Sequence, residues 1–129
     1  MSSKVRLNHL TDMRQTVLDF VEDLRENVFP TSEYENDFTR MRMYVMALSD
    51  DALMQKVIKN FLPHSNYAEN RNPKFFKAIV PLLSRLPKTR VSFYLSKLKS
   101  GELGEDNMNT IWGFMNTIIA IAEDFKKTK

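Results

Sequence analysis

Apolar residues recur at steps of three and four along most of the chain, and no segment alternates with period two. The strongest pattern runs from Asn107 to Phe125, where Ile111, Met115 and Ile118 lie on one helical face. Further apolar residues widen this stripe beyond a single face. Because a helix that is apolar most of the way round is usually enclosed by others, we predict a buried C-terminal helix around which the other helices pack.

Prolines and capping residues divide the rest of the chain into further helices. Thr11 is a good N-cap, so the first helix is expected to begin there and to end before Pro30. Ser32 and Glu35 form a capping-box pattern at the start of the second helix, and Ser49 is expected to cap the third. Asn72 is expected to cap the fourth, with Pro73 at its first helical position. The expected helices before the C-terminal one cover about residues 11–29, 32–48, 50–62, 73–86 with a bend at Pro81, and 87–100, which ends at Gly101.

These elements predict an all-α fold, a single compact bundle of five to seven helices formed by residues 1–129. Residues 1–10 are expected to be a flexible lead and residues 126–129 a flexible tail. The chain has no cysteine, which excludes disulfides, and its longest apolar run, Ile118–Ala122, is too short to span a membrane. The first residues lack the apolar run of a secretory signal, so we expect an intracellular protein.

Charge is distributed unevenly along the sequence. Residues 11–55 carry a net charge of −6, whereas residues 56–99 carry +9, with Glu69 as their one acid. Such segregation indicates an anionic partner for the middle third of the chain. The residues predicted to bind that partner are Lys56, Lys59, Arg71, Lys74, Lys77, Arg85, Lys88 and Arg90. The partner could be an acidic protein, the acidic helices of this same chain or of a second copy, or the phosphates of a nucleic acid.

Residues 63–72 form the clearest expected loop, and its polar side chains are a second candidate site. The candidate residues are His64, Asn66, Tyr67 and Glu69. In the alternative interpretation, the Asn and Ser residues only satisfy turn geometry and Arg71 pairs with Glu69. The chain has two histidines, no cysteine and no phosphate-binding glycine loop, so we expect neither a metal, a cofactor nor an enzymatic activity.

Several short motifs follow one another in an order that resembles a known group of proteins. They are Phe29-Pro30, Pro63-His64 with Tyr67 nearby, Arg71-Asn72 followed by Phe75-Phe76, and Ile111-Trp112 followed by Phe114. This order resembles small helical proteins encoded by large DNA viruses that infect algae and other protists. The resemblance implies a protein of the infected cell or the virion, and it brings no catalytic residue with it. It also implies that the stretch from Arg71 to Phe76 anchors the fold at a helix start.

Together these patterns predict a non-enzymatic helical interaction or adaptor protein with a basic central surface, and the resemblance implies a virion-associated protein as the other form of this prediction. That surface is expected to bind an acidic protein partner or the protein itself. The alternative is a nucleic-acid-associated protein that uses the same basic residues on phosphates. A third hypothesis, an enzyme built around residues 64–71, would need a concave pocket that contains His64.

Overall fold

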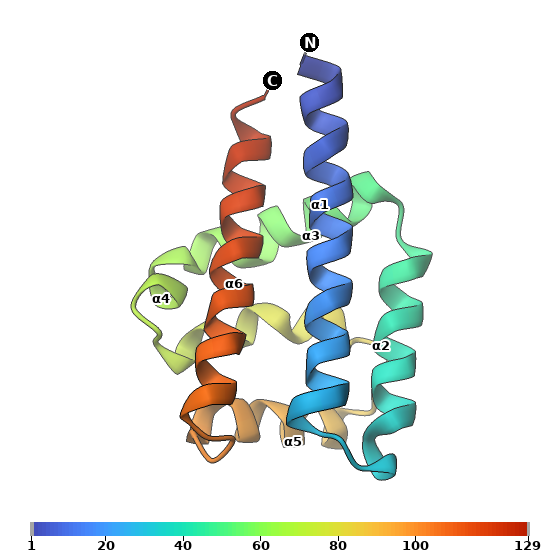
Figure 1. Ribbon diagram of the computed structural model, residues 1–129, viewed down its shortest axis with the longest axis vertical. Helices are drawn as coiled ribbons and strands as arrows, with labels where there is room; N and C mark the ends of the chain where they lie inside the picture. Colours follow the sequence, from blue (N-terminus) through green and yellow to red (C-terminus); the bar gives the residue numbers. More distant parts are fainter. Residues whose placement is uncertain (1, 129) are drawn as a thin grey trace.

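The computed structural model describes residues 2–128, and all the regular structure within this range is helical (Figure 1). The α-helices are α1 (Ser2–Asp23), α2 (Glu35–Ala47), α3 (Asp50–Phe61), α4 (Ser65–Glu69), α5 (Lys88–Ser100) and α6 (Glu105–Lys126). A π-helix, η1 (Leu24–Val28), follows α1, and three 3₁₀ helices complete the chain: η2 (Ser32–Tyr34), η3 (Leu62–His64) and η4 (Pro73–Leu83). The predicted all-α bundle of five to seven helices is confirmed.

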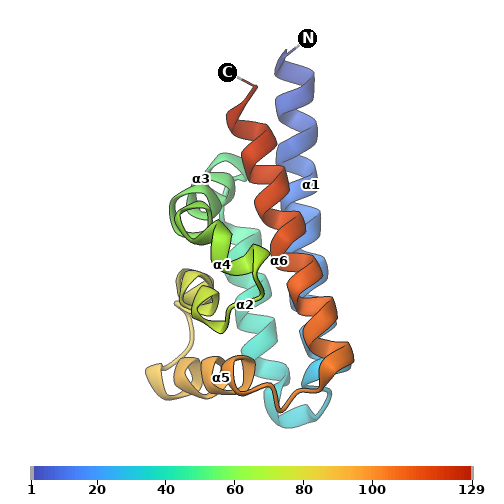
Figure 2. The same ribbon diagram turned by 90° about the vertical axis from the view of Figure 1, so that its left-hand side faces the viewer.

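The helices form two layers. Helices α1 and α6 run antiparallel side by side, so that both ends of the chain lie at the same end of the molecule (Figure 1). Helix α2 packs along the other side of α1, and α3, α4, η4 and α5 follow one another in a second layer, in which α3 and α4 pack against α6 (Figure 2). Helix η4 contacts α2, α3, α4 and α5, which makes it the centre of this second layer.

Helix α6 supplies much of the core but is not enclosed on every side. Ile111, Met115 and Ile118 are fully buried. The outer face of α6, by contrast, is exposed at Thr110, Gly113, Thr117 and Ala120. The predicted buried C-terminal helix is therefore a core helix that keeps one face in solvent. Small residues interrupt the apolar pattern and leave one stripe facing solvent.

Residues 2–10 continue α1 instead of forming the expected lead before a cap at Thr11. The guanidinium of Arg6 lies 4.2 Å from the centroid of the Phe125 ring and also donates to the Thr128 hydroxyl. Pairing with α6 thus stabilises the first turns of α1. At the other end, the Thr128 hydroxyl donates to the Phe125 carbonyl, so residues 126–128 continue in hydrogen-bonded turns, while residue 129 lies outside the described range.

Three of the predicted caps are confirmed, whereas the cap at Thr11 and the capping box at Ser32 are wrong. The Ser49 side chain accepts from the backbone N–H three residues on, the Asn72 side chain accepts from the N–H two residues on, and Gly101 ends α5 with a φ of 78°. The Ser32–Glu35 capping box does not form, because the backbone at Ser32 is already turned into η2 and no side chain caps it.

Arg14 joins three helices, although its sequence position marks it only as a polar residue beside the α1 stripe. Its Nη1 donates to the Val45 carbonyl at 2.9 Å and its Nη2 donates to the Leu48 carbonyl, both at the end of α2. Its Nε donates to the Asp50 carboxylate, at 2.6 Å, in the first turn of α3. A cation at the carbonyl end of a helix and a carboxylate at an N-terminus both suit the helix dipoles. Arg14 therefore fixes the α2–α3 corner against α1.

Helix η4 replaces the α-helix that was expected to bend at Pro81. Its exposure repeats every three residues: Lys74, Lys77 and Val80 are exposed, and the two residues between successive members are buried. A 3₁₀ helix has three residues per turn, so this pattern places two-thirds of η4 against its neighbours. The three exposed residues form one row along its outer edge.

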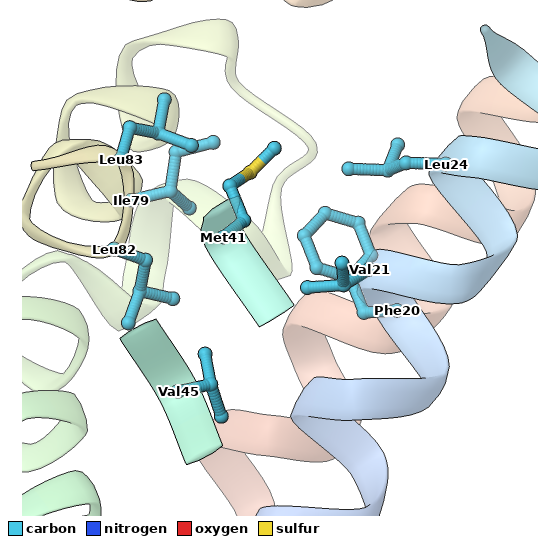
Figure 3. Close-up of a pocket in the computed structure, with 8 residues that line it drawn as sticks. All are labelled: Phe20, Val21, Leu24, Met41, Val45, Ile79, Leu82 and Leu83. Atoms are coloured by element: carbon cyan, nitrogen blue, oxygen red, sulfur yellow. The ribbon is translucent and has the colours of Figure 1, made fainter. Parts of the chain in front are cut away.

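A small apolar cavity lies where α1, α2 and η4 meet (Figure 3). Its volume is about 20 Å³, and its walls are Phe20, Val21, Leu24, Met41, Val45, Ile79, Leu82 and Leu83. A buried water needs polar partners, and these side chains offer none. We therefore interpret the cavity as a packing void rather than a ligand site.

Candidate anion-binding surface

The predicted basic residues do not share one face, but two of them meet at an aromatic ring that the sequence did not single out. Tyr44 is a half-buried residue of α2. The Lys56 ammonium, from α3, lies 5.8 Å from its ring centroid, and the Arg85 guanidinium, from the turn between η4 and α5, lies 5.4 Å from it. Both distances fall within the range of cation–π attraction. The ring thus holds two cations from different elements close together.

A third cation, Arg40, lies beside Arg85. Arg40 precedes Tyr44 by four residues on α2, which places the two on neighbouring turns of one helix face. Together with Met43 and Arg85, Arg40 lines a surface hollow of about 210 Å³. We call the set Arg40, Tyr44, Lys56 and Arg85 the Tyr44 surface.

None of the three cations of the Tyr44 surface forms an ion pair within residues 2–128. Of the ten basic residues between Lys56 and Lys99, only Arg90 and Lys97 are paired in that range. The expected pairing of the basic middle third with this chain's own acidic helices is therefore limited to one contact, between Arg90 and Asp37. The unpaired guanidinium and ammonium groups can donate hydrogen bonds to a carboxylate or a phosphate.

Lys74 and Lys77 lie elsewhere on the same half of the molecule, in the exposed row of η4. The 3₁₀ rise places them about 6 Å apart along the helix axis. Lys88 is exposed in the first turn of α5, and Lys59 is exposed on α3, one turn after Lys56. These side chains extend the cationic character beyond the Tyr44 surface.

Arg90 does not belong to the free cations. Its Nε donates to Oδ2 of Asp37 at 2.8 Å, and the Tyr94 hydroxyl donates to the same oxygen at 2.6 Å. Its Nη2 lies 2.7 Å from that oxygen as an ion-pair contact and donates to the Tyr94 hydroxyl at 3.3 Å. Asp37 is the one charged side chain classed as buried within the described residues. The hydrogen bond with Asp37 raises the pKa of Arg90, and burial, followed by the bond to Asp37, raises the pKa of Tyr94. Arg90 thus joins α5 to α2, and its guanidinium is already engaged by Asp37, so the prediction that it binds an external anion has no support in these contacts.

An aromatic cluster surrounds this buried pair. The Arg90 guanidinium lies between 5.2 and 5.5 Å from the ring centroids of Tyr34, Phe93 and Tyr94. The Phe29 ring packs edge-on against Tyr94 at 5.1 Å. The rings keep most water away from the Asp37 carboxylate, whose side chain is 11% exposed, whereas the Arg90 side chain stays 34% exposed.

Arg71 is also engaged within the fold. It ends α4 with a φ of 53°, and the hydrogen bonds Asn72 N–H to Tyr67 O and Arg71 N–H to Ala68 O define a Schellman motif. Its Nη1 donates to Oδ1 of Asn109 on α6 at 2.5 Å, so the alternative pairing with Glu69 does not form. Helices α4 and α2 lie on opposite sides of the bundle (Figure 1), which separates Arg71 from the Tyr44 surface.

The expected loop at residues 63–72 is largely helical, because η3 and α4 occupy residues 62–69. The His64 and Tyr67 rings stack with their centroids 6.0 Å apart, and Tyr67 also packs on the core. Asn66 and Glu69 are exposed. Asn116 of α6 donates to the Ala68 carbonyl and so fastens α4 to the bundle. These residues serve local packing and capping, which agrees with the structural interpretation of this stretch.

No known protein family, curated protein or solved structure matches the chain. Across residues 2–128, no helix combines the length and apolar character that crossing a membrane requires. In the same range, no cluster of three or more His, Asp or Glu side chains could hold a metal ion.

Sequence reasoning identified Lys56 and Arg85 but missed Arg40, Tyr44 and Asp37. Arg40 lies in the acidic first third, where the net charge conceals it. The helical spacing of Arg40 and Tyr44 was visible in the sequence. Their approach to Arg85, more than forty positions away, depends on the packing of η4 against α2.

Proposed function

We propose that this chain is a non-enzymatic interaction protein that binds an acidic segment of a partner protein at the Tyr44 surface. The observation that carries the proposal is the convergence of Arg40, Lys56 and Arg85, from three elements, without an ion pair in the described range. Like charges held close together repel one another. An acidic ligand relieves that repulsion and gains charge-assisted hydrogen bonds.

The surroundings of the Tyr44 surface favour a protein over a nucleic acid. Met43 and Met46, on the same helix, are 63% and 51% exposed. Flexible thioethers suit adaptable contacts with apolar side chains. The Tyr44 ring already contacts two cations, so a stacking base would have to displace them.

A nucleic-acid partner remains the alternative, since phosphates require only an array of cations. The exposed row that contains Lys74 and Lys77 supports this second candidate. Binding to a second copy is a further option, because acids of the first third such as Asp19, Glu26 and Glu33 are exposed. The three partners differ in composition, and one set of titrations separates them.

The test is fluorescence anisotropy with a labelled Asp/Glu-rich peptide, a random DNA duplex and a matched RNA, at low and at physiological salt. We expect the acidic peptide to bind. The triple variant Arg40→Ala, Lys56→Ala, Arg85→Ala should lower the peptide affinity at least about tenfold, since each lost charged contact removes roughly 0.5 kcal/mol or more of binding free energy. The control triple variant Lys99→Ala, Lys126→Ala, Lys127→Ala removes the same charge from exposed positions elsewhere and should change the peptide affinity little.

Three results would count against the proposal. Equal losses in both triple variants would show that net charge alone attracts the peptide. Binding of DNA or RNA in preference to the peptide, with a steep loss on adding salt, would favour the nucleic-acid alternative. A concentration-dependent dimer in sedimentation that the triple variant abolishes would favour a second copy.

A further inference from the structure

A groove between η4 and α5 has an apolar floor that nothing in the described chain covers. Helix η4 and α5 lie one above the other on the face turned away from α1 and α6 (Figure 2). They border a surface hollow of about 420 Å³. Its walls are Val80, Pro81, Leu83, Ser84, Leu86, Lys88, Val91 and Ser92. Val80 is 37% exposed, although its neighbours along η4 are mostly buried.

The charge around this groove has one sign. Residues 70–101, which include all of η4 and α5, contain no Asp or Glu. Lys77 precedes Val80 by one 3₁₀ turn, so the two are adjacent in the exposed row of η4. Lys88 lines the groove from α5, and neither lysine forms an ion pair within residues 2–128. The apolar floor therefore lies beside cations on both of its bordering helices.

We propose that this groove binds a large aliphatic or aromatic side chain from an acidic segment of a partner protein, with the carboxylates of that segment on Lys77 and Lys88. The inference rests on the proposed function, since both need an acidic partner, and it adds the apolar anchor. Ser84 of the groove directly precedes Arg85 of the Tyr44 surface. One continuous partner segment can therefore reach both.

Charge complementarity argues against a second copy as the occupant. Apart from Val80, the large apolar side chains exposed in the described range are Val5, Leu7, Met43 and Met46. Val5 and Leu7 flank Arg6, and the two methionines follow Arg40 and Arg42 within α2. A copy that inserted any of them would bring basic residues against Lys77 and Lys88. A foreign segment with acids beside its apolar residue avoids this repulsion.

The test begins with selection of binders from a random displayed peptide library on the full-length protein. Anisotropy then measures the enriched peptide and its version with the apolar residue changed to Ser. We expect enrichment of Asp and Glu around one large apolar residue, and about tenfold weaker binding after its replacement. In the protein variant Val80→Ser, the affinities of the enriched peptide and of its Ser version should differ by about twofold or less. The control Leu7→Ser changes an exposed apolar residue outside the groove and should leave the difference intact. Circular dichroism establishes that both variants fold.

Each other outcome overturns the inference in a distinguishable way. Enriched peptides that are acidic but need no apolar residue, or a difference that survives Val80→Ser, would refute the groove and leave the proposed function standing. Peptides without acids, or no enrichment, would refute both. Self-association that Val80→Ser abolishes would assign the groove to a second copy.

Discussion

Removal of the Asp37 carboxylate should destabilise the fold more than loss of any exposed acid. In Asp37→Ala, Oδ2 disappears and leaves two donors without their acceptor, Nε of Arg90 and the Tyr94 hydroxyl, while Nη2 of Arg90 loses its ion-pair contact. The hydroxyl is buried, because Tyr94 is only 3% exposed. The variant therefore leaves an unpaired cation and an unsatisfied polar group between α2 and α5.

The magnitude follows from how well each group can regain water. Removing one partner of a buried ion pair costs about 3–5 kcal/mol, but the Arg90 side chain is 34% exposed and can be rehydrated in part. The orphaned Tyr94 hydroxyl adds about 1 kcal/mol or more. We therefore expect Asp37→Ala to lower the free energy of unfolding by about 3 kcal/mol. Asp37→Asn keeps an acceptor without the charge and should cost roughly half as much.

Urea denaturation at neutral pH, followed by circular dichroism, measures these losses. The control is Asp12→Ala, because Asp12 is exposed, and surface changes of this kind usually stay within about 0.5 kcal/mol. A double-mutant cycle between Asp37→Ala and Arg90→Ala should give a coupling of at least about 1 kcal/mol. If Asp37→Ala costs no more than the control, the pair does not hold α5 on α2.

Four other changes test separate parts of the fold, each by urea denaturation. Arg14→Ala should lower the free energy of unfolding by about 2 kcal/mol, because two carbonyls at the end of α2 lose a charged donor. Arg14→Lys should lose less, and a loss under about 0.5 kcal/mol in Arg14→Ala would show that Arg14 does not fix the α2–α3 corner. Val45→Ile adds one methylene beside the cavity of Figure 3 and should stabilise by up to about 0.8 kcal/mol, whereas a clear loss would show that no void exists. Arg71→Gly relieves a left-handed backbone and should be neutral or stabilising by up to about 1 kcal/mol, while Arg71→Val should destabilise. The pKa of the Tyr94 hydroxyl is raised in the folded state, so above about pH 10 the unfolded chain loses the hydroxyl proton more readily and the free energy of unfolding falls as pH rises. Tyr94→Phe should make this fall with pH shallower, and an unchanged pH dependence would contradict the raised pKa.

The helices and their caps were largely predictable because their causes are local. Phe38, Met41 and Val45 repeat at helical spacing, and all three are buried in α2. The Ser49 and Asn72 side chains accept hydrogen bonds from backbone N–H groups two or three residues further on, so a short stretch of sequence contains the whole capping motif. Such short-range geometry depends little on the rest of the fold.

The features that the sequence did not predict depend on contacts between distant residues. The first turns of α1 are stabilised by the contact of Arg6 with Phe125 and Thr128, more than a hundred positions away. Helix η4 adopts 3₁₀ geometry where α-helical geometry was expected, and its three-residue exposure pattern becomes clear only once its buried neighbours are known. Arg90 was grouped with free cations, because its partner Asp37 lies 53 positions away.

Of the candidate site, the residue type was predictable and the arrangement was not. A basic middle third was evident from the sequence, yet its members point to several places: Arg71 to α6, Arg90 to α2, and Lys56 and Arg85 to Tyr44. Basic residues that are close in the sequence give a segment its net charge, whereas a binding surface requires that their side chains lie on one face of the fold. The resemblance to small helical proteins of large DNA viruses stays a prediction.

The most direct test of the central claim is to map where an acidic peptide contacts the protein. Addition of an unlabelled Asp/Glu-rich peptide to isotope-labelled protein should shift the backbone amide NMR signals around Arg40 and Tyr44 on α2, Lys56 on α3 and Arg85 before α5. Signals around Arg71 and along the outer face of α6 should stay unchanged. Shifts spread evenly over all basic residues, or centred away from Tyr44, would contradict the account.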